Sequence, residues 1–231
     1  MSSYDTLQQI LQYTFQHPDL LRQALVHRSY LNENPDFALG HNERLEYLGD
    51  AVLELIVSEH LYLHYPNPEG DLTNWRASLV NAKSLSEVAK GLDLDQYLLM
   101  SRGESKEKNT KARQNIHANA VEAIIGAMYL DGGTVPAQAF INHHILSRLP
   151  AILANETFID PKSRFQEMSQ AVFGITPAYK VLKEWGPDHD KHFLMGVYIG
   201  DEEVATGEGA SKQEAQVAAA ANGLQAKGWA K

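Results

Sequence analysis

Cysteine is absent from this chain of 231 residues. Its absence excludes disulfide bonds, thiolate metal ligands and a cysteine nucleophile, and it fits a cytoplasmic protein. The chain also has no long uncharged apolar run, and residues 1–11 lack a basic stretch followed by an apolar one. We therefore expect neither a membrane span nor a secretion signal, and no membrane partner. A hydrophobic fraction of 44% is sufficient for a globular protein with a sizeable core.

Basic residues are scarce relative to acidic ones. The chain has 20 Lys and Arg against 29 Asp and Glu, which gives a formal net charge of −9. This balance argues against a protein that binds nucleic acid through a broad basic surface. Any nucleic-acid partner must be recognised through local contacts instead.

Residues 1–150 follow a helical pattern almost throughout. Asn42 is placed to cap a helix that carries Leu45 and Leu48 on its apolar face and ends at Pro66. Further apolar periodicity predicts helices at 6–14, 18–30, 72–90, 114–130 and 136–154.

The pattern changes after a short polar connection at residues 155–160. A helix is predicted over residues 162–173, followed by three strands, of which the clearest places Phe193, Met195, Val197 and Ile199 on one side. Ser211 then caps an Ala-rich helix. The sequence therefore predicts an all-α domain followed by a small α+β module with the order α-β-β-β-α.

Four acidic residues form one stripe on the helix after Asn42. Glu43, Glu46, Asp50 and Glu54 are spaced by three, four and four residues, and their neighbours are largely apolar. Carboxylates in apolar surroundings need a compensating cation or hydrogen-bond donor, and a divalent metal is a natural candidate. The alternative is a solvated acidic face. A solvated face would be expected to carry Lys or Arg one turn from the acidic residues, and no Lys or Arg lies four residues from the stripe.

A second apolar helix carries one carboxylate. Glu122 is the only charged residue between Gln114 and Leu130, and Asn119 shares its face. Glu122 either pairs with a cation from elsewhere or binds a metal. Two such helices packed face to face would offer oxygen ligands suited to Mg²⁺, and metal-assisted phosphodiester hydrolysis is then the leading reaction class.

These residues resemble a known family. The segment 42–53 is similar to the signature of the ribonuclease III endonuclease domain, and residues 118–131 resemble its second metal-binding helix. The C-terminal module resembles a double-stranded-RNA-binding domain. The resemblance implies an endonuclease domain at 1–154, a linker at 155–160 and a double-stranded-RNA-binding domain at 161–231.

The resemblance implies a Mg²⁺-dependent enzyme, with Mn²⁺ as a possible substitute, that cleaves double-stranded RNA to 5′-phosphate and 3′-hydroxyl ends. Its expected substrates are ribosomal RNA precursors and structured messages, and its expected assembly is a homodimer. The roles carried over are metal binding by Glu46, Asp50, Asn119 and Glu122, catalysis by Asp50 and Glu122, acidic support by Glu43 and Glu69, and a dimer contact by Tyr47.

One position departs from the family pattern, because Asn119 stands where the family usually has an aspartate. Its carbonyl oxygen can bind a hard cation but adds no negative charge, so we expect weaker Mg²⁺ affinity and a shift towards Mn²⁺. The alternative function is a catalytically impaired protein that only binds double-stranded RNA. Against it stands the retention of five acidic residues, because a scaffold without activity has no need of uncompensated acids. These are Glu43, Glu46, Asp50, Glu69 and Glu122.

The predicted RNA-binding module is not basic, since residues 162–231 contain eight Lys and Arg against nine Asp and Glu. Duplex RNA is recognised largely by its shape and its 2′-hydroxyls, so local placement matters more than net charge. The resemblance points to Gln166 and His189 for the minor grooves and to Lys212 for phosphates.

The basic run from Lys106 to Arg113, beside the second apolar helix, is either a solvated loop or a further phosphate contact.

Overall fold

The computed structural model describes residues 3–106, 110–154, 161–187 and 191–229, so the predicted linker at 155–160 lies outside the described residues. The chain divides into two compact units, Met1–Phe158 and Ile159–Lys231, each with its own hydrophobic core. The described part of the first unit is helical, in the order α1 (Ser3–Ile10), α2 (Pro18–Ala24), α3 (Arg28–Glu33), α4 (Glu43–His64), α5 (Glu69–Val80), α6 (Ala82–Gly91), η1 (Leu94–Gln96), α7 (Arg102–Lys106), α8 (Lys111–Gly132), α9 (Thr134–His144), η2 (Leu146–Arg148) and α10 (Leu149–Ala154).

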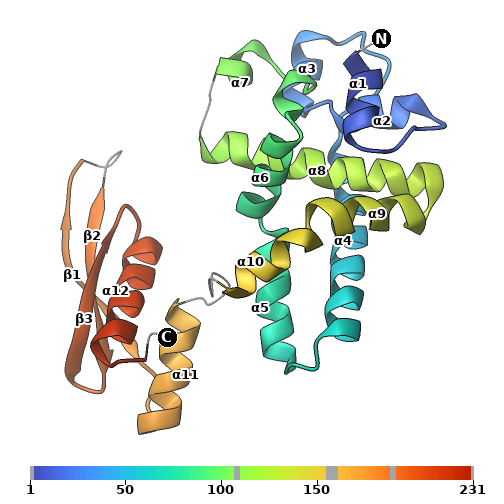
Figure 1. The fold of residues 1–231 in the computed structure, drawn as a ribbon. Helices are drawn as coiled ribbons and strands as arrows, with labels where there is room; N and C mark the ends of the chain where they lie inside the picture. Colours follow the sequence, from blue (N-terminus) through green and yellow to red (C-terminus); the bar gives the residue numbers. More distant parts are fainter. Residues whose placement is uncertain (1–2, 107–109, 155–160, 188–190, 230–231) are drawn as a thin grey trace. The chain divides into compact units, whose positions relative to one another are not determined.

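Helices α4 and α8 pack against each other and form the centre of this unit (Figure 1). Each has 22 residues, which corresponds to a length of about 33 Å. Leu53 of α4 and Ile124 and Ile125 of α8 are completely buried. Among the described helices, none is both long and apolar enough to cross a membrane.

The crossing of α4 and α8 depends on two glycines. A Cβ atom on Gly49 would lie 1.7 Å from the carbonyl oxygen of Glu122, and a Cβ on Gly126 would lie 2.3 Å from that of Leu45. Real Cβ atoms do not approach backbone so closely, so only glycine at both positions lets the two helix backbones touch. The contact lies directly beside Asp50 and one turn from Glu46.

Asn42 occupies the N-cap position of α4, but the prediction that its side chain caps the helix is wrong. Its side chain makes no capping hydrogen bond. The side-chain amide donates instead to the carbonyl oxygen of Ala24 at 3.2 Å, and the residue is buried. Asn42 therefore joins the start of α4 to the end of α2.

Three predicted helices are each divided in the structure. The segment 18–30 forms α2 and α3, which are separated where Val26 forms a β-bridge with Leu99. The segment 72–90 forms α5 and α6, because Asn81 adopts an extended conformation and its side chain caps α6 by accepting from the Ser84 amide at 2.9 Å. The segment 136–154 is interrupted at Ile145, where α9 ends and a 3₁₀ turn leads into α10. Apolar periodicity continues across these three breaks, so the pattern alone did not reveal them.

The second unit has the predicted α-β-β-β-α order. Its elements are α11 (Pro161–Phe173), β1 (Ala178–Trp185), β2 (His192–Ile199), β3 (Glu202–Gly209) and α12 (Lys212–Ala226), and the three strands form an antiparallel sheet in the order β1-β2-β3. Phe193, Met195, Val197 and Ile199 are buried against the helices, as their alternation predicts. Ser211 caps α12 by accepting from the Glu214 amide at 3.2 Å. The fold class predicted from the sequence is confirmed.

Gly49→Ala tests the helix crossing. The added methyl group meets backbone that no side-chain rotation can move, so α4 and α8 must separate, and we expect a loss of about 1–3 kcal/mol in unfolding free energy. Urea denaturation measures this loss. The matched control is Gly91→Ala in α6, where no atom lies within 4 Å of the added carbon. Equal stability of the two variants would contradict the proposed role of Gly49.

Candidate active site

The helix crossing brings together the oxygen-bearing side chains predicted from the sequence. Glu46 and Asp50 lie one turn apart on α4, and Asn119 and Glu122 lie one turn apart on α8. The Asn119 side chain is hydrogen-bonded to the Glu46 carboxyl group. The carboxyl groups of Asp50 and Glu46 in turn lie close enough to Glu122 to raise its pKa. The four residues therefore form one cluster across the two helices.

The cluster concentrates negative charge in a partly buried place. Burial raises the pKa of Glu122 to about 8, and repulsion from Asp50 and Glu46 adds to the shift. Burial also raises the pKa of Glu46, with repulsion from Glu43 and Asp50, while the hydrogen bond from Asn119 opposes the shift. Within the described residues no Lys or Arg forms an ion pair with Glu46, Asp50 or Glu122, so the cation pairing considered for Glu122 is not observed.

Glu43 and Glu54 differ from the rest of the acidic stripe because each has a basic partner. Arg28 lies 3.6 Å from Glu43, and Arg76 of α5 lies 2.8 Å from Glu54. The partner of Glu54 comes from another helix, so spacing within α4 did not reveal it. Glu69, the first residue of α5, is exposed and accepts a hydrogen bond from Thr73 at 2.9 Å.

A cavity of about 440 Å³ extends from this cluster along the N-terminal half of α8. Glu43, Glu46 and Asn119 line one part of it, and the remaining lining includes Arg28 and Glu104. The last two were not among the predicted site residues. Arg28 is the first residue of α3 and Glu104 belongs to α7, and no spacing in the sequence links either of them to the acidic helices.

Tyr47 lies on α4 beside the cluster but points into solvent, with 82% of its surface exposed. Leu55 and Tyr62 are also exposed further along α4, at 68% and 79%. Their spacing places all three within about a quarter-turn of the helix. This row is an apolar surface on a helix whose opposite face is buried in the core.

Two of the three residues predicted to contact RNA lie on the surface of the second unit. Gln166 on α11 and Lys212, the first residue of α12, are both exposed. The Lys212 ammonium lies 5.7 Å from the centre of the Phe193 ring, which holds it near the start of α12. His189 lies outside the described residues.

In the first unit, Arg113 is not a free phosphate contact, because its guanidinium is buried and paired with Asp95 at 2.6 Å.

Comparison with known proteins agrees with this architecture. Residues 17–149 match the family described as Ribonuclease-III-like, and residues 161–227 match the Double-stranded RNA binding motif. The chain is 45% identical over 215 residues to Ribonuclease 3 of Protochlamydia amoebophila, which covers 93% of this chain and 88% of that protein. It is also 42% identical to Ribonuclease 3 of Magnetococcus marinus, with 97% and 93% covered.

This chain belongs to the ribonuclease III family. The nuclease domain of ribonuclease III from Campylobacter jejuni, solved at 2.2 Å, is 38% identical, with a TM-score of 0.55, 65% of this chain covered and 98% of that domain. The protein is therefore an endoribonuclease with a double-stranded-RNA-binding domain after its helical nuclease domain.

The donor set of this ribonuclease III family member suits a hard cation. It combines three carboxylates with one amide oxygen and contains no thiolate or imidazole. In the described part of the chain no group of three or more His, Cys, Asp or Glu side chains is arranged so that it could hold a metal ion. An open arrangement is what Mg²⁺ uses, because it keeps several waters and takes only one or two carboxylates from the protein.

The pKa of Glu122 generates a prediction for the metal-free protein. Its pKa of about 8 in the folded state exceeds its ordinary value of 4.5, so between these values the folded state keeps a proton that the unfolded state has lost. Unfolding free energy should therefore fall as pH rises from about 4.5 to about 8. The slope is at most about 1.4 kcal/mol per pH unit and is reduced by the partial exposure of the group.

Glu122→Gln removes this titration. We expect the variant to show a flatter stability profile than wild type and to be the more stable protein near pH 8.5, with a smaller difference near pH 5. Urea denaturation in the presence of a chelator measures both profiles. Parallel profiles for the two proteins would show that Glu122 has no raised pKa.

Proposed function

We propose that this protein is a divalent-metal-dependent endoribonuclease that hydrolyses both strands of duplex RNA to 5′-phosphate and 3′-hydroxyl ends. The observation that carries the proposal is the cluster of Glu46, Asp50 and Glu122, which share a partly buried site without a basic partner among the described residues. Such a cluster is stable only if protons or a bound cation compensate its charge. The proposed domain limits are 1–154 for the nuclease and 161–231 for the RNA-binding domain.

Glu46, Asp50, Asn119 and Glu122 would hold Mg²⁺ or Mn²⁺. The chemistry that a divalent ion supplies in such a site is stabilisation of the charge that develops on the phosphate, together with activation of a water. Glu122 is protonated at neutral pH in the metal-free protein, so metal binding must release that proton. Asp50 is the exposed member of the cluster, where it can orient a water towards an approaching phosphate.

Glu43 and Glu69 are proposed to support the site from its edges. Glu43 lines the same cavity as Glu46, and its partner Arg28 adds a cation to that cavity, where we propose that it contacts the RNA backbone. Arg28 also limits the repulsion that Glu43 exerts on Glu46. Glu69 is exposed at the start of α5 and is proposed to assist substrate placement.

Asn119 is proposed to set the metal requirement. It contributes an oxygen but no charge, so the site carries one negative charge fewer than a site with four carboxylates. We expect weaker Mg²⁺ binding and a preference for Mn²⁺ relative to Asn119→Asp. The alternative, a protein that binds duplex RNA without cleaving it, would require that this loss of charge abolish metal binding altogether.

RNA binding is proposed to involve Gln166, His189 and Lys212. Gln166, in the middle of α11, and Lys212, the first residue of α12, are both exposed on the same unit. Backbone N–H groups at the start of α12 add donors for a phosphate. Ribosomal RNA precursors and structured messages in the cytoplasm are the proposed substrates. Duplex RNA is the feature that both have in common.

We propose that the enzyme acts as a homodimer in which Tyr47 contacts the partner subunit. A second solved structure of the Campylobacter jejuni nuclease domain shows structural flexibility in a region involved in dimer formation of that protein. In this chain, the exposed row of Tyr47, Leu55 and Tyr62 offers an apolar surface of the kind that interfaces cover. Sedimentation that finds only monomer at micromolar concentration would contradict this proposal.

One cleavage experiment tests the proposed function. Labelled duplex RNA is incubated with the full chain across Mg²⁺ and Mn²⁺ titrations, and we expect cleavage that requires metal. Glu46→Gln should lower the rate by about 10²–10⁴-fold while RNA binding persists. Its matched control is Glu59→Gln, which makes the same change on an exposed turn of α4 and should leave the rate unchanged. Asn119→Asp should lower the metal concentration needed for half-maximal cleavage.

RNA that is retarded in a gel but remains intact at every metal concentration would contradict the enzymatic function and favour the binding-only alternative. Cleavage restored by Asn119→Asp would assign the defect to that position. Equal loss of activity in the Glu46 and Glu59 variants would show that the effect is not specific to the cluster.

A further inference from the structure

Helix α8 carries a second polar group on the side opposite its acidic one. Arg113 and His117 are one turn apart, and helical geometry places them about 170° around the axis from Asn119 and Glu122. Both are buried, with 7% and 3% of their surfaces exposed. A buried arginine and a buried histidine on one helix face need partners from other elements.

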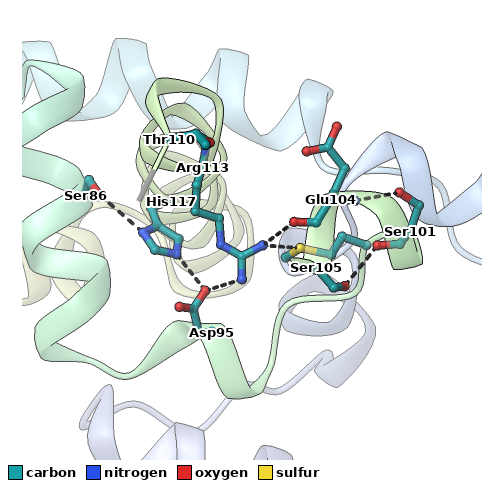
Figure 2. Close-up of polar contacts among 9 residues, drawn as sticks. Ser86, Asp95, Ser101, Glu104, Ser105, Thr110, Arg113 and His117 are labelled. Carbon is teal, nitrogen blue, oxygen red and sulfur yellow. Dashed lines mark hydrogen bonds and ion pairs between the residues drawn. The ribbon is translucent and has the colours of Figure 1, made fainter. Parts of the chain in front are cut away.

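Asp95, on the 3₁₀ turn η1, is the partner that they share (Figure 2). One oxygen of its carboxylate, Oδ1, accepts hydrogen bonds from Arg113 Nη2 at 2.6 Å and from His117 Nε2 at 2.7 Å. With Nε2 donating, Nδ1 of a neutral His117 can accept from the Ser86 hydroxyl of α6 at 3.3 Å. Arg113 Nη1 also donates to the carbonyl oxygen of Glu104 at 3.4 Å. Figure 2 shows these contacts converging on the first turns of α8 from three separate segments.

The contact of Gly126 with α4 and the hydrogen bonds to Asp95 lie on opposite faces of α8 and at different positions along its axis. Gly126 contacts α4 on the face of Asn119 and Glu122, whereas the Asp95 contacts lie on the other face, about 16 Å closer to the helix start. Asn119 and Glu122 lie between them. Apolar packing of Ile116, Ala118 and Val121 also holds the N-terminal half of α8 in the core. The Asp95 hydrogen bonds add a directional contact on the face away from α4.

We infer that Asp95 is a positioning residue, which fixes the rotation of α8 through Arg113 and His117 and so keeps Asn119 and Glu122 directed at Glu46 and Asp50. This inference rests on the proposed function of that cluster. A rotation of about 10° displaces an atom about 6 Å from the helix axis by about 1 Å. Functional side chains must be held within about 0.5 Å of their working positions, so this displacement is large enough to matter.

The chemistry of the group supports a positioning role over a purely stabilising one. A buried ion pair often stabilises a fold no better than apolar side chains of similar volume. Its hydrogen bonds are directional, however, and a carboxylate oxygen shared by two donors defines the angle of the helix that carries them. Apolar packing would hold α8 in place without defining its rotation equally well.

His117→Leu and His117→Gln provide the test, with the full chain used throughout. Leucine keeps the volume and suits the buried surroundings but removes the donor to Asp95, whereas glutamine retains a side-chain N–H donor. We expect His117→Leu to bind Mn²⁺ about 10- to 100-fold more weakly in the absence of RNA, measured by electron paramagnetic resonance of the free ion. We also expect its kcat for duplex RNA to fall by a similar factor while KM stays within about twofold. His117→Gln should recover most of both losses.

Asp95→Asn is the second variant. Its amide oxygen can still accept from both donors, which share Oδ1 in the wild-type protein, but it lacks the negative charge that strengthens both hydrogen bonds. It should therefore impair Mn²⁺ binding and kcat in the same direction as His117→Leu, by a smaller factor. The matched control is Glu87→Gln on α6, which breaks an ion pair with Arg148 next to Ser86 without touching α8. Whatever its stability to urea, this control should match wild type in Mn²⁺ binding and kcat.

Wild-type Mn²⁺ affinity and kcat in both His117→Leu and Asp95→Asn would overturn the inference. The inference would also be overturned if these two variants lost no more Mn²⁺ affinity and kcat than Glu87→Gln does. The same holds if their losses were explained by the fraction of unfolded protein measured in urea. Absence of cleavage by the wild-type chain is a different result, because it contradicts the proposed function. Mn²⁺ binding by RNA-free protein still tests the positioning role in that case.

Discussion

Direct contact between the backbones of α4 and α8 is the constraint on which the remainder of the nuclease domain depends. Gly49 and Gly126 permit it, since a methyl group at either position would overlap a backbone carbonyl of the other helix. The contact brings side chains one turn away on each helix within reach of each other. Glu46 and Asp50 therefore meet Asn119 and Glu122 as a consequence of helix packing, and no loop is needed to assemble them.

Close packing of these helices also creates an electrostatic problem. Three carboxyl groups share a partly buried site. Burial raises the pKa of Glu122 to about 8, and repulsion from Asp50 and Glu46 adds to this shift. Asn119 lessens the problem because it adds no charge and is hydrogen-bonded to Glu46. The same neutrality should reduce the attraction for a divalent cation.

Much of the fold and the core of the site could be predicted from the sequence. The acidic stripe and the isolated Glu122 lie on strongly periodic helices, where spacing within one element carries the information. The break at Asn81 and the unexpected partner of Asn42 could not be predicted, because each depends on a local conformation or a contact with another segment. Arg113 is the clearest example, since its partner Asp95 is 18 residues away and makes an apparently solvated basic residue a buried one.

The most direct test of the central claim is to locate a divalent ion in crystals of the full chain grown with Mn²⁺, using anomalous diffraction. We expect an anomalous peak within coordination distance of the carboxylate oxygens of Glu46 and Glu122, with Asp50 and the Asn119 oxygen around it. A peak elsewhere on the nuclease domain, or an empty cluster in protein that cleaves duplex RNA with Mn²⁺, would contradict the claim that this helix crossing builds the metal site.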